Sequence, residues 1–342
     1  MKKGVILVNL GTPDGPTTVE VRRFLREFLS DPRVIDLSFP FRWLLLNLVI
    51  LPFRPRRSAK AYASIWTREG SPLMVHSRAL EGTLSELLEK ENIPVVLSMR
   101  YGNPSIKDAL KKLHELKCER LLILPLFPQH ASSTTGSIRE AVFREADGDL
   151  ENSKINVVRP FFNHMGFINA FVERGRPFVE KEPEHIVFSF HGLPERHLTR
   201  EDEKEHGCLR REECCDSIVA TNQNCYRAQC FRTAELIAGG LQLKRENWSV
   251  SFQSRLGRGE WIKPYTEQKI RELARKGLKQ VTVFCPAFVS DCLETLEEIA
   301  IGCNEAFRQE GGEKLSLVPS LNADTVWVSG LTDIIQDSIS LG

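Results

Sequence analysis

The sequence predicts an α/β protein built from two doubly wound, Rossmann-like lobes with parallel sheets. Short apolar runs of four to six residues recur along the chain, and stretches with an apolar helical stripe separate them. Alternation of this kind favours βαβ units and parallel sheets. The chain has 342 residues, which exceeds the usual size of a single core, and its 42% hydrophobic content is enough for two packed interiors.

The apolar runs are the expected strands, and they lie at Val5 to Leu10, Val95 to Met99, Leu121 to Leu126, Ile155 to Val158, Ile186 to Phe190, Ser249 to Phe252 and Val281 to Phe284. The expected helices show apolar residues at helical spacing, and they lie at Leu73 to Leu88, Ile106 to Leu116, Phe167 to Val179, Tyr265 to Lys276, Leu293 to Phe307 and Ala323 to Leu341, with one more beginning near Tyr226. The sequence itself shows no internal repeat.

These elements divide into an N-terminal lobe over residues 1–160, a C-terminal lobe over 161–320, and a C-terminal helix over 321–342 that packs on the lobes. Ligands of open parallel sheets bind beyond the carboxyl ends of the strands. Asn9, Arg100, Phe127 and His191 all follow expected strands. We therefore expect an active-site cleft between the lobes.

The charge balance gives no reason to expect a nucleic-acid partner. Lys and Arg total 46 against 45 Asp and Glu, for a net charge of +1. The first apolar run is broken at Asn9, which makes it too short for a signal peptide, and no run approaches the roughly 18 apolar residues of a transmembrane helix. We expect a cytoplasmic protein, in which the nine cysteines are reduced thiols or metal ligands.

Two segments suggest a base and a track of carboxylates. His191 ends an apolar strand at a turn with Gly192, and Glu294 and Glu298 lie four residues apart on one helical face. A histidine opposite paired carboxylates suits the insertion of a metal into a protonated nitrogen ligand. The same residues also fit a hydrogen-bonded structural histidine and an exposed acidic helix face, and Asp291 fits a helix cap as well as a catalytic group.

Motifs spread over nearly the whole chain resemble those of the ferrochelatase family. They are Val8-Asn9-Leu10-Gly11-Thr12-Pro13, Gly70-Ser71-Pro72-Leu73, Met99-Arg100-Tyr101-Gly102, Phe127-Pro128-Gln129-His130, Ser133-Thr134-Thr135-Gly136, Ser189-Phe190-His191-Gly192-Leu193-Pro194, Phe252-Gln253-Ser254-Arg255 and the segment Ser290 to Glu298. The resemblance implies a lyase that distorts protoporphyrin IX, removes its pyrrole protons and inserts ferrous iron to form protohaem. It makes His191 and Glu294 the catalytic residues, with Glu298 as a further iron contact.

The resemblance also implies porphyrin contacts. Propionate or edge contacts fall at Arg57, Lys60, Ser71, Arg100 and Tyr101, and apolar walls fall at Leu10, Trp261 and Phe288. Leu10 replaces a tyrosine typical of the coproporphyrin branch, which favours protoporphyrin IX. Coproporphyrin III ferrochelatase and a chelatase for another tetrapyrrole are the alternatives within this enzyme class.

An apolar segment over residues 39–57 forms a lip of the N-terminal lobe. It contains Phe39 to Phe53 and ends in Arg54, Arg56 and Arg57. It is too short to span a bilayer, but apolar residues with basic flanks suit contact with the inner face of a membrane. A buried helix and an oligomer contact remain open, as does the choice between monomer and homodimer.

A charged insert over residues 197–230 holds five of the nine cysteines. Clustered thiols in a reducing compartment suggest zinc or an iron–sulfur cluster, and no Cys-x-x-Cys pair decides between them. The insert resembles that of bacterial ferrochelatases with a [2Fe-2S] cluster. The resemblance implies Cys208, Cys215, Cys225 and Cys230 as ligands, with Cys214 as the substitute for Cys215.

A function of another class stays open beside the enzyme. Under this alternative the protein binds haem or senses redox state, and the cysteine insert is the functional site. The presence of both His191 and Glu294 argues against this reading.

Overall fold

The computed structural model describes residues 2–146, 154–202, 207–211, 213–255, 257 and 259–340. The chain forms two compact units. Unit 1 comprises Met1–Phe127, Ser132–Arg159 and Ile335–Gly342, and unit 2 comprises Pro128–Ala131 and Pro160–Ile334.

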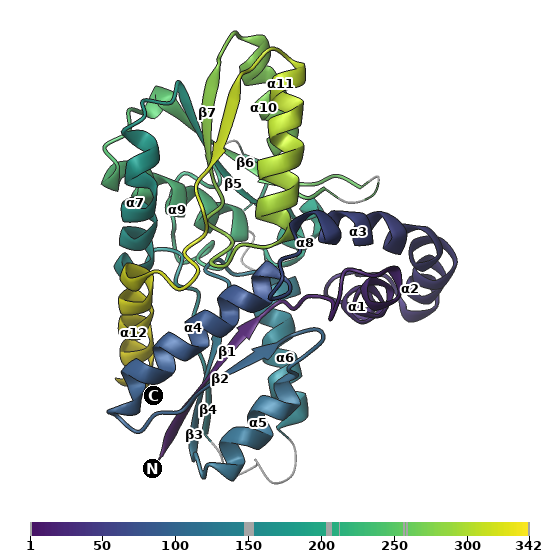
Figure 1. Cartoon of the computed structure of the whole chain (residues 1–342), viewed down its shortest axis with the longest axis vertical. Helices are drawn as coiled ribbons and strands as arrows, with labels where there is room; N and C mark the ends of the chain where they lie inside the picture. The colour runs from purple at the N-terminus through teal and green to yellow at the C-terminus, as the bar shows by residue number, and fades with distance from the viewer. Residues whose placement is uncertain are drawn as a thin grey trace. The chain divides into compact units, whose positions relative to one another are not determined.

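Unit 1 contains a four-stranded parallel sheet with the order β2-β1-β3-β4 (Figure 1). Its strands are β1 (Lys3–Asn9), β2 (Val95–Met99), β3 (Arg120–Pro125) and β4 (Lys154–Val157). Ile6 in the central strand β1 pairs with Val96 on one side and Ile123 on the other. A strand with neighbours on both sides is apolar along its length, and in β1 every residue from Gly4 to Asn9 is buried.

Helices complete unit 1. They are α1 (Thr18–Ser30), α2 (Phe39–Leu44), α3 (Leu51–Ile65), α4 (Pro72–Glu89), α5 (Ile106–Glu115) and α6 (Ser137–Glu145), with π-helical segments η1 (Leu45–Ile50) and η2 (Ser132–Gly136). One core cluster joins Leu110 of α5 and Ile138 of α6 to Ile6 of β1. A capping box between Ser105 and Asp108 begins α5, because each side chain bonds the other's backbone N–H.

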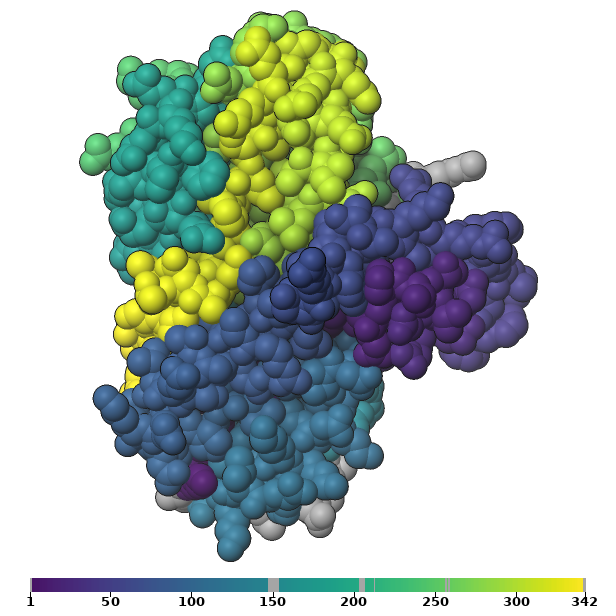
Figure 2. All heavy atoms as spheres, in the orientation of Figure 1, coloured from purple at the N-terminus to yellow at the C-terminus, as the bar shows by residue number. Residues whose placement is uncertain are grey.

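The helices α1, α2 and α3 with η1 form a group beside the sheet of unit 1, which we call the helical group (Figure 1). Its surface, in purple and indigo, stands out from that unit in Figure 2. Several large apolar side chains of α2, η1 and α3 are exposed, with Phe39 at 70%, Phe41 at 67% and Phe53 at 75%. The apolar lip is therefore helical, and much of it faces solvent.

Strand β2 lies at the edge of its sheet, and a side chain covers part of that edge. Glu81 of α4 accepts a hydrogen bond from the backbone N–H of Leu97 at 2.7 Å. Arg78, one turn earlier, forms an ion pair with the same carboxylate.

Unit 2 contains a second parallel sheet, with the order β6-β5-β7-β8. Its strands are β5 (His185–His191), β6 (Trp248–Gln253), β7 (Gln280–Phe284) and β8 (Lys314–Leu317). Around it lie α7 (Met165–Val179), α8 (Glu195–Arg200), α9 (Tyr226–Gly240), α10 (Thr266–Arg275), α11 (Asn304–Gln309), the 3₁₀ turn η3 (Arg245–Asn247) and the π-helix η4 (Glu294–Cys303). The last helix, α12 (Thr325–Ser340), begins in unit 2 and ends with residues of unit 1.

Helices α7 and α12 meet at two glycines. A Cβ atom on Gly330 would lie 2.5 Å from the carbonyl oxygen of Gly166, and one on Gly166 would lie 2.6 Å from the Cα atom of Gly330. Such distances are below any real contact, so the two backbones come this close only because neither residue has a side chain.

The two parallel sheets with flanking helices confirm the expected α/β class. Two elements differ from the expectation: strand β8 was not expected, and the segment Leu293 to Phe307 is a π-helix followed by α11 and not one α-helix. The two sheets also have the same strand order, which the sequence does not indicate because it shows no internal repeat. The expected final helix reached Leu341, which lies outside the described residues. No helix in the described ranges is long and apolar enough to cross a membrane.

Candidate active site

His191 is the last residue of β5, and its ring is partly buried. Its Nδ1 atom lies 2.6 Å from the carbonyl oxygen of Gly192, and the hydroxyl of Tyr226 donates to the His191 carbonyl at 2.7 Å. A carbonyl only accepts, so Nδ1 carries the proton and Nε2 is left as the acceptor nitrogen. The ring centroid lies 6.4 Å from that of Trp261 and 6.3 Å from that of Phe288. His191 thus offers the acceptor atom Nε2 as a base, and two aromatic side chains lie near its ring.

Glu298, in η4, receives hydrogen bonds from the turn that ends β6. The Ser254 backbone N–H and hydroxyl donate to its two oxygens at 2.6 and 2.5 Å, and Gln253 Nε2 donates at 3.2 Å. Burial raises the pKa of Glu298, and the Ser254 bonds and the charge of His191 oppose that rise only in part. The carboxylate is therefore fixed in orientation and accepts a proton more readily than an exposed one.

Gln253 connects three parts of this site. It pairs with His191 across the sheet, its Nε2 also donates to the Glu294 carbonyl at 2.8 Å, and its Oε1 accepts from Ser189 at 2.7 Å. Ser254, the next residue, has φ of 67°, in the left-handed region that non-glycine residues seldom adopt. This backbone turn aims both donors of Ser254 at Glu298.

Glu294 lies at the start of η4 and is partly exposed. The buried thiol of Cys292 donates to it, and burial followed by the Glu294 charge raises the pKa of Cys292. Asp291 is engaged elsewhere. Its carboxylate accepts from Thr295 at 3.0 Å, from the Ser320 N–H at 3.1 Å and from Asn322 at 2.9 Å, so it ties the start of η4 to the turn before α12.

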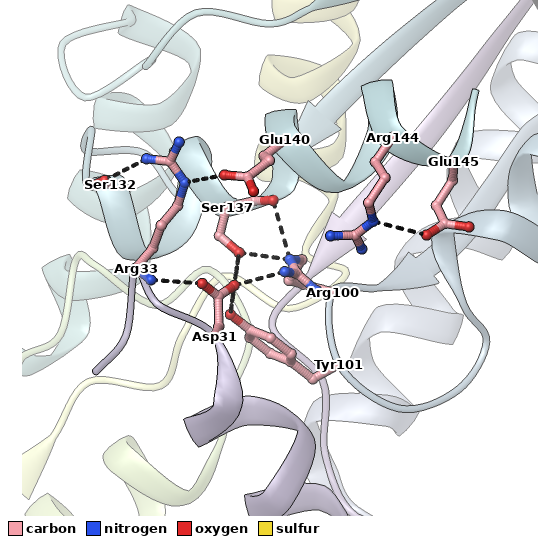
Figure 3. A network of polar contacts seen from close by, with 9 residues as sticks. All are labelled: Asp31, Arg33, Arg100, Tyr101, Ser132, Ser137, Glu140, Arg144 and Glu145. Carbon is pink, nitrogen blue, oxygen red and sulfur yellow. Dashed lines mark hydrogen bonds and ion pairs between the residues drawn. The ribbon is translucent and has the colours of Figure 1, made fainter. Parts of the chain in front are cut away.

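In unit 1 the expected porphyrin contacts gather at the carboxyl ends of β1 and β2. The Tyr101 N–H donates to the Leu10 carbonyl at 2.9 Å, and buried Ser71 accepts from Thr12 at 2.8 Å. Tyr101 is buried and Arg100 is half-buried. Both donate hydrogen bonds to Asp31, as Figure 3 shows. Arg57 and Lys60 differ from them, because both lie exposed on α3, one helical turn apart.

Four cysteines of the insert lie close to one another. Cys225, before α9, accepts from the thiols of Cys208 and Cys215, which lower its pKa below the ordinary value. The sulfur atoms of Cys214 and Cys215 are 3.6 Å apart, and Cys208, Cys214 and Cys225 line a cavity of about 70 Å³. Cys230 is fully buried in α9. Residues 203–206 and 212 of the insert lie outside the described residues. Within the described ones, no group of three or more His, Cys, Asp or Glu side chains is arranged to hold a metal ion.

The sequence profile described as Ferrochelatase matches residues 2–339. The chain belongs to the ferrochelatase family. It is therefore an enzyme of the metal-chelatase type, and the resemblance of its motifs to this family is confirmed.

Full-length ferrochelatases from two bacteria share nearly half of the sequence. The ferrochelatase of Coxiella burnetii (strain Dugway 5J108-111) is 47% identical over 341 residues, which are 99% of this chain and 95% of the relative. That of Pseudomonas fluorescens (strain Pf0-1) is 46% identical over 333 residues, which are 97% of each chain.

A solved chelatase has the same fold. The sirohydrochlorin chelatase SirB from Bacillus subtilis subspecies spizizenii, in complex with cobalt, superposes with a TM-score of 0.54. The match covers 99% of this chain and 96% of SirB at 9% identity, so it shows a shared fold and nothing finer.

Sequence reasoning missed three groups in this ferrochelatase that hold the expected site residues. The sequence marks Gln253 and Ser254 only as part of a family motif and Tyr226 only as the start of a helix, and Asp31 belongs to none of the motifs. Their positions depend on a left-handed turn and on contacts between distant segments, which periodicity does not reveal. The string Asp31-Pro32-Arg33 at the end of α1 was the one local signal of a chain turn.

Proposed function

We propose that this ferrochelatase inserts ferrous iron into protoporphyrin IX to form protohaem, with His191 and Glu294 as its catalytic residues. Membership of the ferrochelatase family supports the insertion of iron into a porphyrin in haem synthesis. One observation supports the catalytic assignment. His191 keeps Nε2 as an acceptor, and its ring lies close enough to Glu298 of η4 for its charge to affect the pKa of that carboxylate.

Insertion replaces two pyrrole protons by one Fe²⁺ ion, so the enzyme has to accept two protons. His191 Nε2 takes the first proton, and Glu294 contacts the iron and passes on the second. We place Glu298 farther from the porphyrin centre than Glu294, because Ser254 and Gln253 already donate hydrogen bonds to its oxygens. Its raised pKa suits a group that receives a proton from the site and releases it later.

Porphyrin binding needs apolar walls and cations for the propionates. We assign the walls to Leu10, Trp261 and Phe288, and the propionate or edge contacts to Arg57, Lys60, Ser71, Arg100 and Tyr101. Exposure of Arg57 and Lys60 supports their pairing with propionates, because both charges are available to a ligand. Binding energy from the whole macrocycle is then available to distort the ring at its centre.

The choice of protoporphyrin IX over coproporphyrin III depends on Leu10. Its side chain is apolar and partly exposed just after β1. An isobutyl group fits the vinyl edge of protoporphyrin better than the additional propionates of coproporphyrin, which need polar partners.

We also propose that the insert holds a [2Fe-2S] cluster through Cys208, Cys215, Cys225 and Cys230, with Cys214 as the substitute for Cys215. Hydrogen bonds from the Cys208 and Cys215 thiols to Cys225 bring three of these residues together, and the guanidinium of Arg227 donates to Cys215 Sγ at 3.1 Å. Such a cluster supplies one-electron redox chemistry when bound. Iron remains ferrous during insertion, so the reaction above requires no electron from it.

The helical group is our proposed site of peripheral contact with the inner face of the membrane, for a protein otherwise in the cytoplasm. Its exposed aromatic residues and the exposed Arg56 and Arg57 suit an interface of acyl chains and anionic headgroups. The apolar porphyrin would enter the protein from the membrane surface that the helical group contacts.

The deciding experiment is anaerobic insertion of Fe²⁺ by the purified protein, with protoporphyrin IX and coproporphyrin III compared as substrates and the visible spectrum recorded before substrate is added. We expect faster conversion of protoporphyrin and cluster absorption in the resting protein. Faster conversion of coproporphyrin would reverse the substrate assignment. Absence of turnover with both porphyrins would favour haem binding or redox sensing, and an active, colourless protein would contradict the cluster.

A further inference from the structure

Asp31 immediately follows α1, and its carboxylate collects hydrogen bonds from four residues of unit 1. Its Oδ1 accepts from the Arg33 backbone N–H at 2.7 Å. Its Oδ2 accepts from Arg100 Nη2 at 2.7 Å, from the Tyr101 hydroxyl at 2.9 Å and from the Ser137 hydroxyl at 2.6 Å. Figure 3 shows the side chains of Arg100, Tyr101 and Ser137 converging on Asp31, with the backbone nitrogen of Arg33 on its other oxygen.

The guanidinium of Arg100 is held on two of its three nitrogens. Nη2 bonds Asp31, and Nε donates to the Ser137 hydroxyl at 2.6 Å and to its carbonyl at 3.2 Å. The group also stacks over the Tyr101 ring, with its carbon 4.4 Å from the ring centroid. These contacts fix the plane of the guanidinium and leave Nη1 as the nitrogen that they do not use.

The pair is charged and almost dry, with side-chain exposures of 13% for Arg100 and 6% for Asp31. Burial acts to raise the pKa of Asp31, but the bonds from Ser137, Arg33 and Tyr101 and the charge of Arg100 lower it overall. Asp31 therefore stays ionised. A buried guanidinium without its carboxylate would be unpaired, and it would turn away to find another anion or water.

We propose that Asp31 is a positioning residue for the porphyrin carboxylates. It holds Arg100 so that Nη1 is presented to a propionate, and it keeps the Tyr101 ring as a flat support for the guanidinium. This inference rests on the proposed function, in which Arg100 contacts the edge of the porphyrin. It also assigns the Tyr101 hydroxyl to Asp31 and not to the substrate.

The test compares Asp31→Asn, Arg100→Met and the double variant in steady-state iron insertion by the full chain. An amide cannot accept at both ends, so Asp31→Asn leaves a donor facing a donor in either orientation. We expect it to raise the KM for porphyrin about tenfold, which corresponds to the loss of one charge-assisted hydrogen bond. The KM for iron and kcat should stay within about twofold, because the iron site is built from other residues.

The double variant shows whether Asp31 acts through Arg100. Its KM for porphyrin should equal that of Arg100→Met alone, because Asp31 has nothing left to position. This comparison needs only Arg100→Met and the double variant, so it remains available even if Asp31→Asn fails to fold. In Arg100→Met the Asp31 carboxylate keeps its hydrogen bonds from Arg33, Tyr101 and Ser137, and in the double variant neither buried charge remains. The control is Glu140→Gln, which removes an exposed carboxylate bonded to Arg33 in the same network and should leave both KM values unchanged.

A role in folding alone would reduce the active fraction, and with it kcat, at an unchanged KM. That result overturns the inference, as does a KM for the double variant well above that of Arg100→Met, or an Arg100→Met variant with the parental KM. If the parent chain does not metallate any porphyrin, the proposed function fails first, and the two failures are thereby distinguished.

Discussion

The carboxylate of Glu298 shows how a turn prepares a side chain for proton transfer. Ser254 adopts a left-handed conformation at the end of β6 and so directs two donors at the carboxylate. Backbone strain of this kind is retained where the surrounding structure requires it and is common at functional sites. The sequence shows only a serine after a strand.

We expect Glu298→Gln to lower kcat for metallation about a hundredfold, the size typical of a lost acid–base group. The KM for porphyrin should change by less than about twofold, because Glu298 is not a proposed contact of the ring edge. The control Glu305→Gln removes an exposed carboxylate from the next helix and should retain full activity.

His191→Ala should abolish turnover, because it removes the proposed base. A His191→Ala enzyme with parental kcat would show that His191 is not that base.

Asp31 should make the protein sensitive to acid. Because its pKa is lower in the folded than in the unfolded chain, the free energy of unfolding gains from Asp31 at pH values above the unfolded pKa. That gain is lost as the pH falls through the folded pKa. Urea unfolding of the parent and of Asp31→Asn/Arg100→Met between pH 3 and 7 should therefore show a steeper loss in the parent, and equal slopes would contradict it.

Much of the candidate site could be named from the sequence, but its supporting residues could not. His191 and the glutamates stood at the end of a strand and the start of a helix, which are positions that a pattern of elements predicts. Gln253 supports Glu298 through a contact across 45 residues of chain, and Asp31 supports Arg100 through one across 69 residues. No local pattern brings such pairs together.

At the scale of elements, periodicity predicted most strands of both sheets and failed where its signal is weak. β8 is a four-residue edge strand with one buried residue and only two apolar residues, so it lacks the apolar run of a central strand. Over ten residues, a π-helix and an α-helix present similar apolar spacing, so η4 was taken for an α-helix. The helix α1 was overlooked, although Val21, Phe24, Leu25 and Leu29 have helical spacing and are buried.

The contact of α7 with α12 should not tolerate a side chain. Gly330→Ala places a Cβ against the backbone of Gly166, and we expect a loss of about 1–3 kcal/mol in the free energy of unfolding, as for other overpacked sites. Gly82→Ala in the middle of α4 meets nothing within 4 Å. It should gain about 0.5–1 kcal/mol from helix propensity. Denaturant titration of both variants checks the pair, and a neutral Gly330→Ala would show that the helices can separate at no cost.

The helical group should bind lipid through its apolar residues. Leu48→Ser combined with Phe53→Ser removes two side chains that are 61% and 75% exposed. Their burial in a bilayer interface would contribute roughly 1.5–3 kcal/mol each, so binding should fall about tenfold or more. Cosedimentation with vesicles of phosphatidylethanolamine and phosphatidylglycerol measures this, with Phe143→Ser of α6, exposed at 45%, as the control. Equal losses in both variants would indicate unspecific adsorption.

At the scale of the whole molecule, the two units repeat one plan. Each sheet has its first strand second in order, and in each unit a π-helical segment follows the third strand. Turns at Pro160–Asn163 and Pro319–Asn322 lead into α7 and α12, and the side chains of His164 and Asp324 cap these helices by accepting from Gly166 and Val326. The plan is preserved in backbone geometry while the side chains have diverged, which is why comparison of residues alone did not reveal it.

Segments of each unit are separated in the chain by parts of the other, and this should make unfolding cooperative. Gln129, in the short stretch Pro128–Ala131 of unit 2, is buried and bonded to Thr233 at 3.1 Å, and the residues of α12 from Ile335 on belong to unit 1. Neither unit can lose its structure without disturbing the chain path of the other. Urea transitions followed by tryptophan fluorescence and by far-UV circular dichroism should coincide. Two resolved transitions would show independent units.

The Glu81 carboxylate, which bonds the edge strand β2, should hinder aggregation of this protein. Open rims of sheets invite strands from other chains, which is a first step of aggregation. A strand from another chain that pairs with β2 would have to displace the Glu81 carboxylate from the Leu97 N–H. The negative charge of Glu81 would then lie in the new interface without this donor, which is unfavourable. The enzyme therefore exposes several phenylalanines on its helical group, while the edge of its sheet at β2 disfavours pairing with a strand of another copy.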